Sequence, residues 1–285
     1  MTDRFSRAFP FLFVVLWSTG FIGARLGLPH IEPLTFLLIR YLVVIGCMVV
    51  LALAFRAPWP QTPSAWLHIG IAGLLMHGVY LGGVFIAISK GLPAGVASLV
   101  VGVQPLLTAV GAGWLLGETV LKRQWLGLLL GLAGVALVVF NKIGGTFGLA
   151  ALVPAVAALS GLTAGTLYQK RFCPSFDWRT GSVAQFVPTA VVTGLLAWCF
   201  ETGTIDWTGE LVFALGWLVL VLSLGAVSLL NWLIRNSNAV NIASLFYLVP
   251  PCTAVFAWLL FGETFTGLAL LGMVLTVWGV YLARK

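Results

Sequence analysis

The chain has 285 residues, of which 60% are hydrophobic and only 8% are charged, and its mean hydropathy is +1.07. Soluble domains carry roughly 25% charged residues, so this composition excludes a soluble domain and predicts a helical membrane protein. The net charge of +7 is attributed to basic membrane loops, and no nucleic-acid partner is expected.

Apolar segments of about 20 residues follow one another along the chain, with short loops between them. The segments are continuous and do not alternate in polarity, so they predict transmembrane helices and not the strands of a barrel. Ten spans are expected, at 8–25, 34–55, 65–90, 93–117, 122–141, 147–171, 180–200, 210–235, 239–262 and 266–283.

Basic residues predict the orientation of these spans. With the N-terminus in the cytoplasm, eleven Lys and Arg residues fall on the inner side, and three (Arg25, Lys90 and Lys142) fall on the outer side. By the positive-inside rule, both termini are therefore predicted to be cytoplasmic, in a bacterial inner membrane that the chain crosses ten times.

Two stretches, 97–134 and 243–279, carry the same motif. The shared residues, 145 positions apart, are Pro105 and Pro250, Gly117-Glu118 and Gly262-Glu263, Gly127 and Gly272, and Gly134 and Gly279. The chain is therefore expected to consist of two repeats, 1–141 and 142–285, with five helices each. An odd number of helices inserts the second copy upside down, so the repeats are predicted to be inverted, as in many secondary transporters.

Prolines lie in the middle of two corresponding spans, Pro105 in the fourth and Pro250 with Pro251 in the ninth. Proline lacks an N–H and clashes with the carbonyl four residues earlier, so both helices are expected to kink. In hydrocarbon, the released carbonyl must face protein or a watery cavity. The symmetric placement predicts a hinge or cavity wall in each half, and a static packing kink is the alternative.

Polar and aromatic side chains deep within the spans are the candidate substrate-binding residues, because such polar groups are costly to bury and are commonly functional. These candidates are Trp17, Ser18, His77, Tyr80, Gln104, Asn231 and Tyr247. For Ser18, a bond to a carbonyl of its own helix is an equally good interpretation. The aromatic residues would line an apolar cavity for a planar or amphipathic solute, and ordinary core packing explains each of them as well.

Arg40 is the charged residue that lies well within a span, about six residues into the second one and roughly 9 Å deep by helical rise. Its side chain either extends to the outer interface or binds a substrate carboxylate. Both interpretations stay open, and Arg40 is therefore counted among the candidate substrate-binding residues.

Motifs for other chemistry are absent from the sequence. It contains no Walker-type phosphate loop, HExxH or serine-hydrolase motif, and its four cysteines lack metal-ligand spacing, so no enzyme, ATPase subunit, metal or cofactor is expected. None of the eight acidic residues lies at the centre of a span, and His77 is the one mid-membrane group that would titrate near neutral pH.

Ten spans in two five-helix halves, each with a kinked helix that ends in Gly-Glu, resemble the drug/metabolite transporter superfamily of the EamA type. The resemblance covers nearly the whole chain. It implies a basket of helices around a central cavity and alternating access by rocking of the two halves. The aromatic residues are most similar to those of exporters of aromatic amino acids.

The expected function is therefore a secondary transporter that exports small metabolites, most of all aromatic and other apolar amino acids, through the lipid bilayer. One alternative is a carrier of nucleotide sugars or phosphate esters, which would need paired inward cations where only Arg40 is available. The other is a membrane enzyme or lipid-handling protein, which would need a polar catalytic cluster that the sequence does not show.

Overall fold

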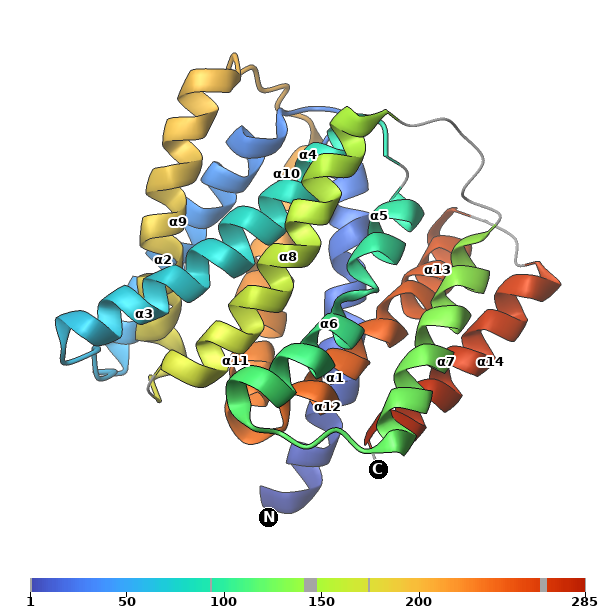
Figure 1. The fold of residues 1–285 in the computed structure, drawn as a ribbon. Coiled ribbons are helices and arrows are strands. Elements are labelled where there is room, and N and C mark those ends of the chain that lie inside the picture. Colours follow the sequence, from blue (N-terminus) through green and yellow to red (C-terminus); the bar gives the residue numbers. More distant parts are fainter. Residues whose placement is uncertain (1, 93, 141–147, 174, 262–265, 285) are drawn as a thin grey trace.

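The computed structural model describes the chain apart from residues 1, 93, 141–147, 174, 262–265 and 285. The described part is almost entirely helical, and ten helical stretches are long and apolar enough to cross a membrane (Figure 1). Their ends lie within three residues of the predicted ones, which confirms the spans. They are Ala8–Gly27, Pro33–Ala54, Pro63–Ser89, Val96–Leu116, Lys122–Val139, Leu149–Phe172, Trp178–Phe200, Gly209–Asn236, Ala239–Leu260 and Gly267–Arg284.

Several spans are divided into shorter segments. The first half contains α1 (Thr2–Gly27), α2 (Pro33–Ala54), α3 (Pro63–Gly73), η1 (Leu74–Leu81), α4 (Gly82–Ser89), α5 (Ala94–Val101), α6 (Gln104–Gly111), η2 (Ala112–Leu116) and α7 (Lys122–Val139). The second half contains α8 (Leu149–Phe172), α9 (Trp178–Phe200), α10 (Gly209–Trp217), η4 (Leu218–Ala226), α11 (Val227–Asn236), α12 (Ala239–Leu245), η5 (Phe246–Leu248), α13 (Val249–Phe261) and α14 (Gly267–Arg284).

The third and eighth spans have the same build. Each begins with a threonine cap, where the hydroxyl of Thr62 accepts a hydrogen bond from the N–H of Ala65 and that of Thr208 accepts one from Leu211. Each then contains a π-helical segment, η1 in the third span and η4 in the eighth. The two segments lie at corresponding positions of the sequence repeat. Wide π turns inside α-helices are rare and are frequent at functional sites.

The fourth and ninth spans break just before their prolines, which confirms the predicted kinks. In the fourth span, Gly102 and Val103 separate α5 from α6, and Pro105 lies in the first turn of α6. In the ninth span, the 3₁₀ segment η5 separates α12 from α13, which carries Pro250 and Pro251 near its start. Their role as hinges stays a prediction.

Helices α7 and α14 run side by side (Figure 1) and meet through glycines. A Cβ atom added to Gly127 would lie 2.5 Å from the carbonyl oxygen of Gly279, and one added to Gly134 would lie 2.6 Å from that of Gly272. The contacts are reciprocal, since a Cβ on Gly279 or Gly272 would in turn meet the partner's oxygen at 2.6 Å. The two helices are therefore antiparallel, as the predicted inverted repeat requires.

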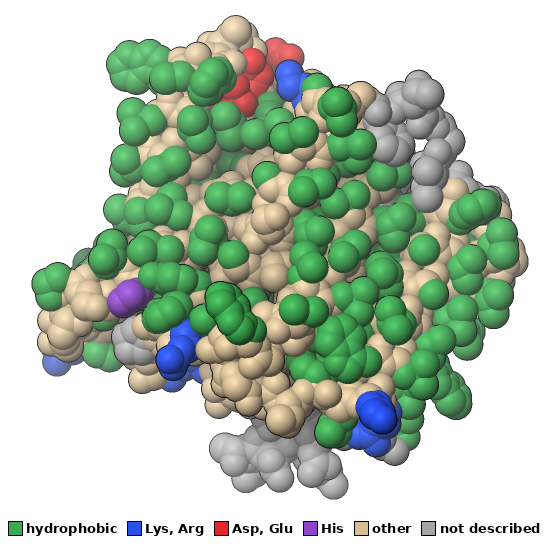
Figure 2. Space-filling view, viewed as in Figure 1, with side chains coloured by type: hydrophobic (Ala, Val, Ile, Leu, Met, Phe, Trp, Pro, Cys, Tyr) green, Lys and Arg blue, Asp and Glu red, His purple; other side chains and the backbone are tan. Residues whose placement is uncertain are grey.

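Buried apolar side chains form a large cluster between α1, α2, the third span and the eighth span, with Phe36, Tyr41 and Leu218 among its members. A second cluster surrounds Tyr247 between α7, α8 and α14. Figure 2 shows Lys and Arg side chains near the lower end of the visible face, where the N-terminus lies, and Asp and Glu near the upper end with a Lys or Arg side chain beside them. We call these the cytoplasmic end and the outer end, following the predicted orientation.

Candidate functional site

A small central cavity lies between the two halves of the chain, with a volume of about 30 Å³. Its lining comes from α1, α2, η1 and α4 of the first half and from η4 and α11 of the second. The lining residues are Trp17, Gly20, Ala24, Arg40, Tyr80, Leu81, Val84, Phe85, Leu222 and Val227. Three of the predicted binding residues, Trp17, Arg40 and Tyr80, are therefore brought together. The volume is enough for about one water molecule, so this conformation is closed around its centre.

Arg40 lies inside the protein, and its predicted alternative of extending to the outer interface is wrong. Only 1% of the residue is exposed, because the side chain points from α2 toward the eighth span and not along its own helix. Its Nε donates a hydrogen bond to the Ser223 hydroxyl at 3.0 Å, and its Nη1 is buried without a hydrogen-bond partner. No Asp or Glu appears among the described residues that line the cavity, so this guanidinium has no counter-ion there.

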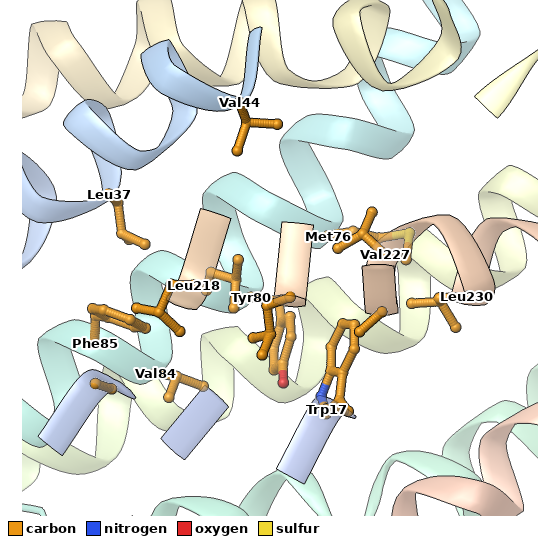
Figure 3. Packing of buried hydrophobic residues seen from close by; sticks show 14 of the residues in the cluster. Trp17, Leu37, Val44, Met76, Tyr80, Val84, Phe85, Leu218, Val227 and Leu230 are labelled. Carbon is orange, nitrogen blue, oxygen red and sulfur yellow. The ribbon is translucent and has the colours of Figure 1, made fainter. Parts of the chain in front are cut away.

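Aromatic rings form one wall of the cavity. Trp17 and Tyr80 lie next to each other, as Figure 3 shows. Their rings stack with centroids 6.3 Å apart and planes 9° from parallel. Phe246 meets Trp17 edge to face, with the ring centroids 5.5 Å apart. Phe85 lines the cavity directly. This wall offers flat apolar surfaces next to a single cation.

Sequence reasoning selected Tyr247 as a binding candidate, whereas its neighbour Phe246 is the residue that contacts Trp17. Tyr247 lies in the second cluster, where its ring packs against Gly131 of α7, and its hydroxyl is buried without a hydrogen-bond partner. Both residues belong to the 3₁₀ segment η5, in which adjacent side chains point about 120° apart. Only the position of the kink in space decides which of the two faces the cavity wall.

The other polar candidates of the first half lie outside the cavity lining. His77 stacks on Phe186 of α9 at 4.3 Å, and its Nε2 is buried without a hydrogen-bond partner. Gln104 donates to the hydroxyl of Thr108 at 2.9 Å within its own helix. Ser18 donates to the carbonyl of Val14 at 2.6 Å. This is the hydrogen bond within its own helix that was expected as the alternative to substrate binding.

Asn231 belongs to a closed ring of three side-chain amides, one from each of α8, α9 and α11. Gln169 donates to Asn231 at 3.0 Å, Gln185 donates to Gln169 at 2.8 Å, and Asn231 donates to Gln185 at 3.3 Å. All three side chains are buried. The sequence reasoning did not identify the two glutamines, although their polarity inside long apolar spans was a usable signal.

A larger cleft, here called the cytoplasmic cleft, has Asn231 in its lining and a volume of about 800 Å³. The first half of α1, the loop between α8 and α9, and the inner part of the eighth span form its walls. Its lining residues are Phe9, Leu12, Leu16, Pro58, Ser175, Phe176, Asp177, Trp178, Leu224, Gly225, Ser228, Leu229, Asn231, Trp232 and Arg235. This cleft is large enough for a small metabolite, whereas the central cavity is not.

One ion pair borders the cytoplasmic cleft at the start of the seventh span, where Asp177 immediately precedes the span. Asp177 caps α9 by accepting a hydrogen bond from the N–H of Arg179, and its carboxylate also pairs with that guanidinium at 2.8 Å. The hydrogen bonds from Arg179 hold the pKa of Asp177 below its ordinary value. Nearby, burial raises the pKa of the Cys173 thiol to about 12.

Two carboxylates tie the halves together at the outer end, and we call this arrangement the outer clamp. Glu201, at the end of α9, accepts hydrogen bonds from the N–H groups of Leu34 and Thr35 at 2.7 Å each and so caps α2. In the other direction, Glu32 accepts hydrogen bonds from the N–H groups of Thr202 and Gly203 at 2.9 and 2.8 Å. Each loop therefore binds the backbone of the other.

Among the described residues, the cytoplasmic end carries one carboxylate contact of this kind between the halves. Glu118 accepts a hydrogen bond from the N–H of Ala239 at 3.0 Å and so caps α12, and Lys170 lies 3.8 Å from the same carboxylate. Its counterpart in the sequence repeat, Gly262-Glu263, lies outside the described residues.

The sequence matches the model of the EamA-like transporter family twice, over residues 8–140 and 149–284. It is 26% identical over 284 residues to a protein of Escherichia coli (strain K12) named "Probable amino-acid metabolite efflux pump", covering 95% of this chain and 92% of that protein. It is also 26% identical over 276 residues to the "Uncharacterized inner membrane transporter YedA" of the same strain, with 95% and 88% covered.

The fold has a close counterpart among solved structures. One crystal structure matches with a TM-score of 0.80 over 98% of this chain and 96% of its own, at 20% sequence identity. Both named relatives are transporters and not enzymes. The predicted helical membrane fold with ten spans, the resemblance to the EamA type and the multi-pass location in the cell membrane are thereby confirmed. The inverted orientation of the repeats and the cytoplasmic position of the termini stay predictions.

Proposed function

This chain belongs to the EamA-like transporter family, and we propose that it exports small amphipathic metabolites, most of all aromatic and other apolar amino acids and their derivatives. The similarity to a protein named as an amino-acid metabolite efflux pump supports this substrate class. The composition of the central cavity supports it further, since flat apolar walls and one cation suit an amphipathic solute better than a strongly charged one.

The observation that carries this proposal is the position of Arg40 between the two halves. A buried guanidinium without a counter-ion in the described lining is costly in a membrane protein and marks a functional site by default. Trp17 and Tyr80 beside it provide a stacking surface contributed by α1 and η1. We infer that substrate lies between these rings with its polar group at Arg40.

Access to this site would alternate between the two ends. A substrate arriving from the cytoplasm would enter the cytoplasmic cleft and pass the amide ring at Asn231. The central cavity would then have to expand, because its 30 Å³ accommodates no metabolite. Bending at Pro105 in one half and at Pro250-Pro251 in the other would supply this movement, as the breaks in both helices allow.

Counterflow into proteoliposomes of the pure protein tests the proposal. Vesicles loaded with unlabelled phenylalanine, methionine and N-acetylphenylalanine, without an ion gradient, are expected to accumulate the corresponding labelled compound. Trp17→Ala should reduce this uptake at least tenfold through loss of the stacking surface. Trp198→Ala is the matched control, because Trp198 is 86% exposed near the end of α9 and should have no effect.

Absence of uptake for every compound, with and without an imposed proton gradient, would contradict the proposal. Exchange of phosphate esters in place of these compounds would favour the alternative carrier. That alternative is poorly supported by the cavity, in which Arg40 is the one Lys or Arg among the described lining residues.

A further inference from the structure

We propose that the preferred substrates are monoanions, with a carboxylate for Arg40, an apolar or aromatic body and no charged amine. Suitable compounds are N-acylated amino acids and other aromatic carboxylic acids. The inference rests on the proposed function and narrows its substrate class. It differs from the expectation of free amino acids, which are zwitterions at neutral pH.

The first step is the hydrogen-bonding capacity that Arg40 leaves unused. A guanidinium has five N–H donors in a planar fork and no acceptor. In the structure, Nε donates a hydrogen bond to the Ser223 hydroxyl, while Nη1 is buried without a hydrogen-bond partner. A carboxylate is the group that matches such a fork, since two parallel N–H···O bonds form at once.

The second step is the shape of the surroundings. Next to Arg40 the cavity wall consists of Trp17, Tyr80, Phe85 and aliphatic side chains from η1, α4 and η4. These side chains bury an apolar body well, and they solvate a second charge poorly. A monoanion that neutralises Arg40 leaves this apolar site with no net charge, whereas a zwitterion leaves the cation of Arg40 in excess.

The third step is the position of the amine. In an α-amino acid the ammonium is attached to the carbon next to the carboxylate, so it must lie beside the guanidinium that binds that carboxylate. Two like charges at this distance in a poorly solvating site repel each other. No Asp or Glu of the described lining is available to offset the repulsion. Acylation removes the ammonium charge and keeps the carboxylate.

The fourth step excludes anions that carry more than one negative charge. A phosphate ester or nucleotide sugar carries at least one charge more than a carboxylate. With Arg40 as the single Lys or Arg in the described lining, that extra charge would stay unpaired. One cation and apolar walls therefore select for one negative charge.

Four compounds with the same phenyl group test this selection in counterflow. They are N-acetylphenylalanine and 3-phenylpropionate, which are monoanions, phenylalanine, which is a zwitterion, and phenylalaninamide, which is a cation. Exchange of the two monoanions is expected to be at least tenfold faster than that of phenylalanine, and phenylalaninamide is expected not to exchange. Equal exchange of phenylalanine and N-acetylphenylalanine would overturn the inference and leave the proposed function intact. No exchange of any compound would overturn both.

Substitutions of Arg40 separate recognition from a merely structural role. Arg40→Met should lose exchange of the monoanions at least tenfold, and Arg40→Lys should retain part of it. Arg40→Gln should exchange the neutral N-acetylphenylalaninamide better than N-acetylphenylalanine, a reversal that misfolding does not produce. Arg123→Met is the matched control at an exposed position. Unchanged monoanion exchange in Arg40→Met, or no reversal in Arg40→Gln, would overturn the inference.

The charge of the substrate has a second measurable consequence. Export of a monoanion moves one negative charge across the membrane, so an interior-negative potential accelerates it. Vesicles loaded with potassium and treated with valinomycin should release N-acetylphenylalanine at least twofold faster than vesicles without a potential. Phenylalanine release should not respond. A monoanion flux that ignores the potential would contradict transport of the free monoanion.

Discussion

The two ends of the helical bundle are held closed by contacts of the same chemistry but of different extent. At the outer end, Glu201 accepts two backbone N–H groups from the first turn of α2, and Glu32 accepts two from the residues that follow α9. At the cytoplasmic end, one carboxylate of the described residues, Glu118, caps α12. The cytoplasmic cleft, with a volume of about 800 Å³, lies at this end. The difference indicates which contacts must break before a substrate can leave to the outside, namely those of the outer clamp.

Removal of the outer clamp should have the largest effect. Glu201→Ala deletes the cap of α2, and each hydrogen bond to a charged group contributes about 1.5–3 kcal/mol. We expect the outer end to open at least tenfold more often, since about 1.4 kcal/mol is a factor of ten. The measurement is labelling of an Ala24→Cys side chain in the central cavity by an impermeant maleimide added from outside.

All variants in this experiment are made in a chain whose four native cysteines are replaced by serine. The control is Glu210→Ala. Glu210 lies at the same end and contacts His30 at 3.2 Å, but its side chain is 67% exposed. Such exposed pairs contribute little, so labelling should stay unchanged. Equal labelling of the two variants would show that the clamp does not govern access.

Loss of the amide ring should have the next largest effect. Asn231→Leu removes one hydrogen-bond partner from each of two buried glutamines, at a cost of about 1–3 kcal/mol in the free energy of unfolding. Thermal unfolding in detergent should show a lower midpoint. Ser228→Ala, one turn earlier on α11, is the matched control because its hydroxyl is buried without a hydrogen-bond partner. A midpoint as high as that of the control would contradict a stabilising role of the ring.

Removal of the single cytoplasmic cap should have a smaller effect than removal of the outer clamp. Glu118→Ala deletes one helix cap, which is about 1 kcal/mol of stability. Impermeant maleimide added from the cytoplasmic side should label Ala24→Cys a few times faster than before. If this increase exceeds the outer-side increase in Glu201→Ala, the proposed difference between the two ends is wrong.

The smallest expected effect is a pH dependence at the cytoplasmic cleft. The folded pKa of Asp177 is lowered by Arg179, so its contribution to stability is present above the ordinary pKa of 3.8. This contribution is lost as the pH falls through the lowered folded value. Asp177→Asn should therefore melt slightly below the unmodified protein at pH 7, with the difference vanishing in strong acid. A difference that grows on acidification would contradict this sign.

Local features of the fold could be predicted from the sequence. Span positions follow from hydropathy, and the breaks before Pro105 and Pro250 follow from a clash within one helix turn. Tertiary features could not be predicted in this way. The depth of Arg40 along α2 was readable, but the direction of its side chain depends on the eighth span, more than 180 residues later.

Contacts between loops were also hidden in the sequence. Glu201 caps a helix 166 residues away in the chain, and no residue next to it in the sequence predicts this contact. The amide ring joins three helices, so no residue spacing within one helix predicts it. Such pairings depend on how the helices pack, whereas the repeated motif and its proline kinks can be identified from a short stretch of sequence within each half.

The paired π segments have a consequence for the history of the chain. A π turn arises when one residue is added to an α-helix, and η1 and η4 carry this addition at corresponding positions of the repeat. Two independent insertions at the same place are a less economical account than one insertion before the duplication. If the two halves are copies of one five-helix unit, as the sequence repeat predicts, that unit would already have carried the wide turn.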